Sequence, residues 1–192
     1  PYPFEVILSH EFFFTHTEEF WNYCFNELDP SAAKPNAAHI ALAELEKRGK
    51  LKAVVTQNID GLHEAAGSRR VFELHGTAAK GHCVRCGKVY GADAMRARRP
   101  VPRCDCGGLI KPDIVLYGES LDESTVEGAC EEIAESDLLI VGGTSLSVYP
   151  AAGFISLARG KKAFINKTPA PRGSVRFDLE ITGDILLLSR LV

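Results

Sequence analysis

Four clustered cysteines constrain the fold of this chain more than any other feature of its sequence. They follow the pattern C-x2-C, seventeen residues, then C-x-C, at Cys83, Cys86, Cys104 and Cys106. Four thiolates presented by two tight turns are the usual ligands of a closed structural zinc site. We therefore predict one structural zinc ion, which has no open position for catalysis. The alternative is a buried or redox-active cysteine cluster.

Composition narrows the class of protein further. Of the 192 residues, 45% are hydrophobic and 24% are charged, as in ordinary globular proteins. The 22 basic and 25 acidic residues give a formal charge of -3, which argues against the broadly basic surface of a general nucleic-acid-binding protein. No apolar run reaches the ~20 residues of a membrane span, and the first residues do not resemble a signal peptide. We expect a cytoplasmic protein that requires neither nucleic acid nor membrane.

Helical and strand patterns alternate in the rest of the chain, which predicts an α/β fold with a largely parallel sheet. Helices are predicted over residues 17–28, 35–48, 123–135 and 151–159, and strands over residues 51–56, 137–141 and 162–165. The apolar stripe of the second helix is expected to be Ile40, Leu42 and Leu45. Cys24 and Cys130 are expected to be buried small apolar side chains. The cysteine segment interrupts the alternation and is expected to be a small inserted lobe.

Polar residues follow the predicted strands directly. They are Gln57, Asn58 and Asp60 after the first strand, Gly143, Thr144 and Ser145 after the second, and Asn166 and Lys167 after the third. In an open parallel sheet, ligands bind outside the carboxyl ends of the strands. Glycine allows the backbone to approach a ligand closely, and successive N–H groups can bind an anion. Each cluster alone is typical of a turn, but the three together predict a site for a ligand with riboses and phosphates.

Several motifs, taken in order, resemble those of the sirtuin family of NAD-dependent protein-lysine deacylases, in its bacterial type. They are Pro35-Asn36 with His39, TQNIDGLH at 56–63, AGS at 66–68, LHG at 74–76, the four cysteines, KPDIVLYGE at 111–119, GTSL at 143–146 and Ile165-Asn166. The resemblance covers essentially the whole chain. It implies a Rossmann-like NAD-binding lobe, with helices on both faces of its sheet, formed by residues 1–80 and 112–192. Residues 81–111 would form a small zinc-binding lobe.

The resemblance also implies roles for single residues. His75 would be the general base that activates a ribose hydroxyl of NAD, a role that suits histidine because it exchanges protons near neutral pH. Gln57 and Asn58 would hold the nicotinamide ribose, and Asp60 would bind the nicotinamide amide. The remaining NAD contacts would be Gly143, Thr144 and Ser145 at the phosphates, and Asn166, Lys167 and Ile185 at the adenosine end.

The activity implied by the resemblance is deacetylation. The acetyl group would move from lysine to ADP-ribose, and nicotinamide would be released. Proteins or peptides containing acetyl-lysine would bind as an extended strand beside Val115, Leu116, Tyr117 and Gly118. We expect a monomer. Two other interpretations stay open, a mono-ADP-ribosyl transferase that shares the NAD site and a non-catalytic, zinc-containing interaction fragment.

The sequence departs from the family pattern in two places. The first strand and glycine-rich turn of sirtuins do not precede Pro1, and we expect that the natural protein has these residues; a genuine fragment would bind NAD poorly. Sirtuins that prefer acidic acyl groups carry a Tyr-x-x-Arg pair, where this chain has Trp21 and Cys24. A buried carboxylate without a charged partner is costly. We therefore predict a preference for acetyl and longer neutral acyl groups over succinyl.

Overall fold

The computed structural model of the chain describes residues 2–171, 173 and 175–192. These residues form two compact units, each assembled from three segments of the chain. The first unit contains Pro1–Ala33, Asn58–Gly61 and His75–Leu121, and the second contains Lys34–Gln57, Leu62–Leu74 and Asp122–Val192. The boundaries of the two lobes implied by the family resemblance stay a prediction.

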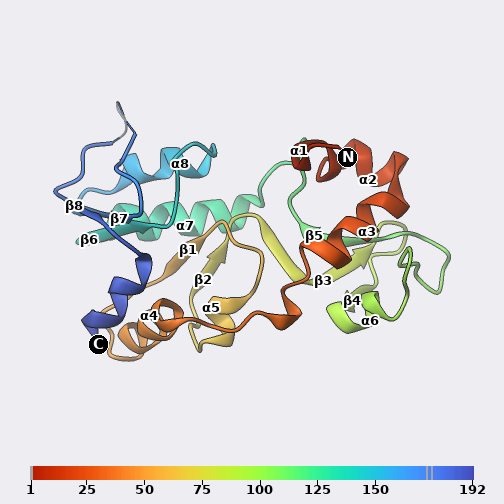
Figure 1. Cartoon of the computed structure of the whole chain (residues 1–192), viewed down its shortest axis with the longest axis horizontal. Coiled ribbons are helices and arrows are strands. Elements are labelled where there is room, and N and C mark those ends of the chain that lie inside the picture. Colours follow the sequence, from red (N-terminus) through yellow and green to blue (C-terminus); the bar gives the residue numbers. More distant parts are fainter. Residues whose placement is uncertain (1, 172, 174) are drawn as a thin grey trace. The chain divides into compact units, whose positions relative to one another are not determined.

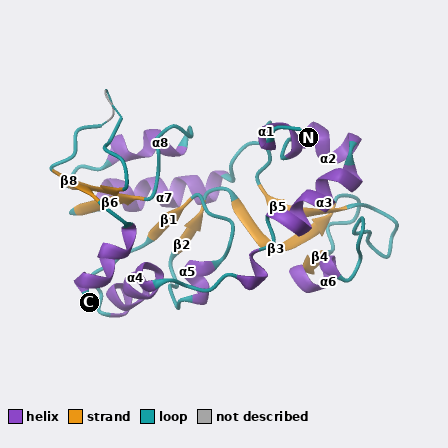
Figure 2. Ribbon diagram, viewed as in Figure 1, coloured by secondary structure: helices purple, strands orange, loops and turns teal. Residues whose placement is uncertain are grey.

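The first unit contains an antiparallel three-stranded sheet. Its central strand is β3 (Gly76–Cys83), with β4 (Val89–Gly91) on one side and β5 (Ile110–Ile114) on the other (Figure 2). The short helix α6 (Ala92–Arg96) follows β4. In the register of β3 and β5, Cys83 pairs with Ile110 at one end and Gly76 pairs with Ile114 at the other. One strand therefore connects the cysteine cluster with the segment that follows His75.

Within the described part of this unit, the helices that precede the sheet are α1 (Phe4–Ile7), α2 (His10–Thr15) and α3 (Thr17–Glu27), followed by the 3-10 turn η1 (Pro30–Ala32). The third confirms the helix predicted over residues 17–28. It buries Phe20 and Trp21 in the core of the unit. The same core contains Cys83 from the sheet, so a predicted metal ligand is part of the packing.

The second unit is built on parallel strands, as predicted. Figure 1 shows β6 (Leu138–Gly142), β7 (Lys161–Asn166) and β8 (Leu179–Thr182) side by side in that order. A separate parallel pair joins β1 (Val54–Thr56) and β2 (Val71–Glu73). The helical elements are α4 (Ala37–Lys47), α5 (Leu62–Ala65), α7 (Glu123–Glu135), α8 (Ala151–Phe154) and the 3-10 segments η2 (Ile155–Leu157) and η3 (Ile185–Leu191).

Helix α4 begins at a capping box. The Asn36 side chain accepts hydrogen bonds from the backbone N–H groups of Ala38 and His39, and His39 Nδ1 accepts the N–H of Asn36. These bonds satisfy N–H groups that have no partner within the helix. The predicted apolar stripe is wrong at Ile40, whose side chain is 56% exposed. The buried face contains Ala38 and Ala41, three residues apart, and Ile40 lies off that face.

The two isolated cysteines are less buried than predicted. Cys24 and Cys130 are both half-buried. Burial nevertheless raises the pKa of the Cys24 thiol to about 12, so it stays neutral at physiological pH. Among the described residues, no helix combines the length and the apolar character required to traverse a lipid bilayer.

Candidate functional site

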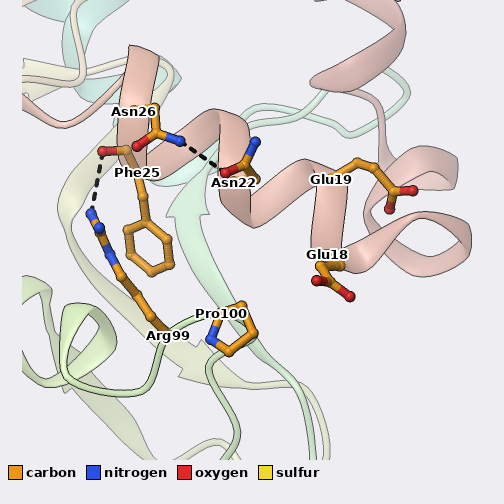
Figure 3. Close-up of a pocket in the computed structure, with 7 residues that line it drawn as sticks. All are labelled: Glu18, Glu19, Asn22, Phe25, Asn26, Arg99 and Pro100. Carbon is orange, nitrogen blue, oxygen red and sulfur yellow. Dashed lines mark hydrogen bonds between the residues drawn. The ribbon is translucent and has the colours of Figure 1, made fainter.

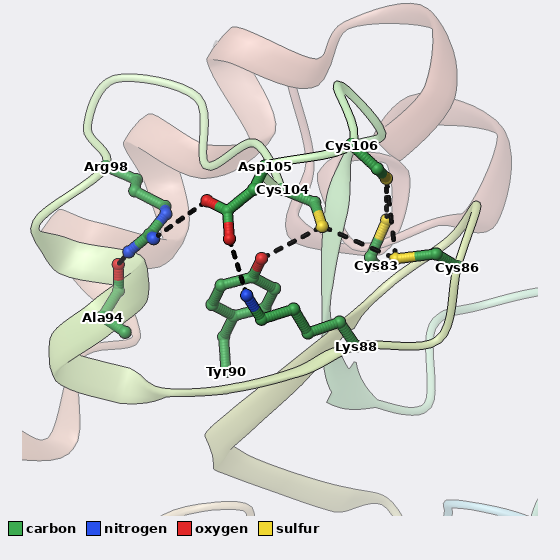
Figure 4. A network of polar contacts seen from close by, with 9 residues as sticks. All are labelled: Cys83, Cys86, Lys88, Tyr90, Ala94, Arg98, Cys104, Asp105 and Cys106. Carbon is green, nitrogen blue, oxygen red and sulfur yellow. Dashed lines mark hydrogen bonds and ion pairs between the residues drawn. The ribbon is translucent and has the colours of Figure 1, made fainter.

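The four clustered cysteines form a geometry that fits a zinc ion. Their sulfur atoms all lie within 4.8 Å of one another (Figure 4). The Cys83–Cys106 and Cys86–Cys106 pairs are 3.5 Å apart, and Cys86–Cys104 is 3.6 Å apart. A tetrahedral zinc with Zn–S bonds of ~2.3 Å would separate its sulfurs by about 3.8 Å. The structure therefore brings all four predicted ligands together around a space of the right size.

The surroundings favour the thiolate, the form of cysteine that binds metal, at Cys104. At Cys86 the Lys88 N–H also favours the thiolate, but hydrogen bonds with the other three sulfurs outweigh it and raise the pKa to about 12. The backbone N–H of Cys106 and the hydroxyl of Tyr90, which donates to Cys104 Sγ at 3.0 Å, lower the pKa of Cys104 to about 6. Lys88 Nζ bonds Asp105 at 2.6 Å and lies 5.3 Å from the centre of the Tyr90 ring. Tyr90 is not among the predicted site residues, because nothing in the local sequence pattern indicates that its hydroxyl donates to a cysteine.

His75 lies in the first unit, between β2 and β3. Its carbonyl accepts a hydrogen bond of 2.9 Å from the N–H of Val115, the first residue of the predicted peptide-binding edge. Segment 58–61, which carries Asn58 and Asp60, is tied to β3 by the bond of 2.9 Å from the Ala78 N–H to the carbonyl of Ile59. The first unit therefore brings together the predicted base, two predicted nicotinamide contacts and the predicted peptide edge.

The next residue, Gly76, explains why this segment can lie so close to β5. Its φ is +70°, and a Cβ at this position would stand 2.0 Å from the carbonyl oxygen of Asp113. Residues other than glycine rarely adopt such a φ, and the space beside Asp113 is too small for any side chain. Glycine at this position allows the backbone beside His75 to pair with Ile114.

The predicted phosphate and adenosine contacts gather in the second unit. Gly143, Thr144 and Ser145 follow β6, and Asn166 at the end of β7 donates its side-chain amide to the carbonyl of Thr144 at 3.1 Å. The N–H of Gly143 donates to the carbonyl of Ile165 at 3.3 Å. The ends of β6 and β7 are thus fixed to each other, with exposed glycine backbone beside them.

Ile185 and Lys167 belong to the same edge of that sheet. A Cβ at Gly142 would stand 2.1 Å from Cδ1 of Ile185, so this side chain lies directly over the end of β6. Lys167 Nζ bonds Asp184, the N-terminal cap of η3, at 3.1 Å. Gln57 directly follows β1, which belongs to a different sheet of the same unit.

The segment predicted to bind the peptide, residues 115–118, is already paired along one edge with residues 8–10 of the chain. The N–H of Tyr117 donates to the carbonyl of Leu8 at 2.9 Å, and the N–H of His10 donates to the carbonyl of Tyr117 at 2.9 Å. These bonds form a parallel bridge at Ser9. Beyond this bridge the chain turns: the N–H of Glu119 donates to the carbonyl of Leu116, and the N–H of Leu116 donates to the Glu119 carboxylate. The sequence did not indicate the bridge between Ser9 and Tyr117, because it joins segments more than a hundred residues apart.

The first unit also has a large surface hollow, which none of these residues lines. Figure 3 shows it on helix α3 and the loop at Pro100. It has a volume of about 520 Å³, and its lining residues are Glu18, Glu19, Asn22, Phe25, Asn26, Arg99 and Pro100. None of the predicted site residues is among them, so size alone does not mark the functional site.

Comparison with known proteins points to one family. The Sir2 family profile matches residues 4–150. A protein of Clostridium acetobutylicum named NAD-dependent protein deacetylase is 48% identical over 186 residues, which covers 96% of this chain and 76% of that protein. A protein of the same name from Clostridium perfringens is also 48% identical, covering 94% of this chain and 75% of that one.

Solved structures agree with the sequence relatives. A structure described as Sir2 with a p53 peptide and NAD+ superposes with a TM-score of 0.90 at 38% identity, covering 96% of this chain and 80% of that one. A structure of Sir2Tm bound to a propionylated peptide gives a TM-score of 0.91 at 37% identity, covering 100% of this chain and 84% of that one. With its cysteine cluster and parallel strands, the chain belongs to the Sir2 family.

Proposed function

We propose that this protein is an NAD-dependent protein-lysine deacetylase, which moves the acetyl group from lysine to ADP-ribose and releases nicotinamide. The observation that carries the proposal is the hydrogen bond between His75 and Val115, which sets the candidate base beside the candidate peptide edge. The names of the relatives and the ligands named for the solved structures support the same activity.

In this proposal, the residues of the chain bind and orient the reactants. An extended acetyl-lysine peptide would bind beside residues 115–118 on the side away from residues 8–10, because residues 8–10 already hold both backbone groups of Tyr117. His75 would accept the proton of a ribose hydroxyl of NAD. Asn58 and Asp60 would hold the nicotinamide end, and the ends of β6 and β7 would hold the phosphates and the adenosine.

The zinc site has a purely structural role in this proposal. Four cysteine ligands complete the tetrahedron of zinc and leave no position for a reactant. Cys83 and Cys104 are also buried in the core of the first unit, so the metal stabilises the packing beneath β3 and β5.

The proposal is tested with purified protein, an acetyl-lysine peptide and NAD. Nicotinamide, deacetylated peptide and acetylated ADP-ribose should appear in equal amounts. NAD labelled in its ADP-ribose part separates the alternative, because an ADP-ribosyl transferase would leave label on protein. Tight peptide binding without any consumption of NAD would instead support a non-catalytic interaction module.

We further propose that the enzyme prefers neutral acyl groups. Trp21 and Cys24 line a small pocket of the first unit, together with mainly apolar side chains. The two charged residues that line it, Asp29 and Arg96, are paired with each other at 3.1 Å. Arg96 also bonds Asp93 at 3.0 Å, so its charge is already balanced by carboxylates of the chain.

Matched acetyl, propionyl and succinyl peptides of one sequence test this preference. The values of kcat/KM for acetyl and propionyl should exceed the value for succinyl by at least about tenfold, because a succinyl carboxylate would be buried without a partner. Equal turnover of the acetyl and succinyl peptides would contradict the assignment of Trp21 and Cys24.

A further inference from the structure

Glu119 stands at the end of the candidate peptide edge, and its carboxylate joins three different parts of the first unit. Oε1 lies 2.9 Å from Nδ1 of His10 on α2. Oε2 lies 2.9 Å from Nζ of Lys111 on β5, and it accepts the backbone N–H of Leu116 at 2.9 Å. A carboxylate with charged and backbone donors forms stronger hydrogen bonds than a neutral group.

Lys111 explains why a carboxylate is needed at this position. It is a buried lysine, 9% exposed, and its ammonium group also donates to the carbonyl of Ile114 at 2.9 Å. Lysine is rarely buried without a charged partner. Burial opposes ionisation of Glu119, but bonds from His10, the Leu116 N–H and Lys111 outweigh it and hold the pKa of Glu119 below its ordinary value. Lys111 and Glu119 therefore form an ion pair anchored on β5.

Glu119 also closes the turn at residues 116–119, which belongs to the candidate peptide edge. The carbonyl of Leu116 accepts the N–H of Glu119 at 2.9 Å, while the N–H of Leu116 is held by the carboxylate of the same residue. Tyr117 is held at the same time by its bridge to Leu8 and His10. Residues 115–118 are thus fixed before any peptide arrives. A preformed edge avoids the entropy cost of ordering a loop on binding.

We propose that Glu119 is the positioning residue of the peptide edge, held in place by Lys111 and His10. The inference rests on the proposed function, because it assigns the substrate peptide to residues 115–118. Glu119 acts through the backbone of Leu116 and touches none of the reacting groups. It should therefore govern the affinity for peptide and leave the affinity for NAD unchanged.

Kinetic constants for each substrate separately test this role. In Glu119→Gln, the KM for acetyl-lysine peptide should rise by about tenfold, because a charge-assisted network is lost, while the KM for NAD stays within about twofold. His10→Ala should raise the peptide KM by only about two- to fivefold. The effect is smaller than in Glu119→Gln because the His10 side chain is half exposed, and exposed ion pairs contribute little. His10→Asn, which keeps a donor near Oε1, should restore most of that loss.

His82→Asn is the matched control. His82 pairs with Lys111 through the β3–β5 ladder, but its side chain bonds Asp113 at 2.6 Å and not Glu119, so it is a histidine–carboxylate pair of the same unit that the substitution can remove separately. Its variant should leave the peptide KM unchanged. Thermal unfolding of each variant shows whether it is folded, and His10→Ala keeps the test decisive if Glu119→Gln unfolds. An unchanged peptide KM in folded Glu119→Gln, or equal rises for peptide and NAD, would overturn the proposal.

Direct binding keeps this inference separate from the proposed function. Fluorescence anisotropy of a labelled acetyl-lysine peptide reports binding without turnover. If the wild-type protein binds the peptide but never releases nicotinamide, the proposed deacetylase activity fails. A loss of peptide affinity in Glu119→Gln would then still support the positioning role, and unchanged affinity would refute it.

Discussion

The backbone of His75 helps to set it into the site, because its carbonyl accepts the N–H of Val115. In His75→Ala that backbone bond is kept, and only the proposed base is lost. We expect kcat to fall by about a hundred- to ten-thousandfold, the range for removal of a general base. Thermal unfolding should be unchanged, and His82→Asn should retain activity as a histidine control on the following strand, β3. Activity of His75→Ala near the wild-type level would show that another group is the base.

Gly76 depends on both its φ and its lack of a side chain. In Gly76→Ala the new Cβ would meet the Asp113 carbonyl at 2.0 Å, in addition to the strain of φ +70°. We expect the free energy of unfolding to fall by roughly 2–4 kcal/mol. Gly49→Ala is the control, because Gly49 has φ +68° and no atom within 4 Å of the added Cβ. Chemical denaturation of both variants measures the difference, and equal losses would show that the close approach to Asp113 is unimportant.

At the scale of elements, the helices with clear caps were the most predictable. Helix α7 spans residues 123–135 as predicted, beginning after Asp122, whose side chain accepts the N–H of Thr125 at 2.8 Å. The predicted strands also formed, with ends shifted by up to three residues. Local sequence determines such elements, because caps and periodicity act over a few residues.

Elements that depend on distant partners were missed. Strand β2 was not predicted, because its three residues gain strand structure only by pairing with β1. The bridge between Ser9 and Tyr117 and the network around Glu119 are likewise invisible in the local pattern. The cysteine spacing and the polar strand ends indicated which residues lie at the sites, and the family motifs implied their roles, but neither showed what holds these residues in place.

A zinc ion bound by the four cysteines would link the end of β3 to the segment before β5, so the loss of one ligand should destabilise both strands. Cys83 ends β3 and is 1% exposed. We expect Cys83→Ser to reduce bound zinc from about one ion per chain to well under half, with a clear loss of stability, because structural zinc contributes folding free energy directly. Metal analysis and thermal unfolding measure both effects. Cys130→Ser, outside the cluster, is the control and should keep its zinc; full zinc content in Cys83→Ser would exclude Cys83 as a ligand.

At the scale of the molecule, the two units differ in what supports their cores. The core of the first unit contains two of the four clustered cysteines, Cys83 and Cys104, together with Phe13, Phe20 and Ile110. The cores of the second unit consist of aliphatic and aromatic side chains around the parallel strands and α7. Metal removal should therefore act on one unit much more strongly than on the other.

Hydrogen exchange after chelation tests this difference. Without zinc, thiolates buried beside aromatic rings lose their counter-charge, so β3, β4 and β5 should open. We expect amide protection in these strands to fall by at least about tenfold, whereas β6, β7 and β8 keep theirs. Adding zinc back should restore protection in the first unit, which controls for irreversible damage. Equal loss of protection in both units would show that their stabilities are coupled as one cooperative fold, and unchanged protection would show that the metal contributes little to either.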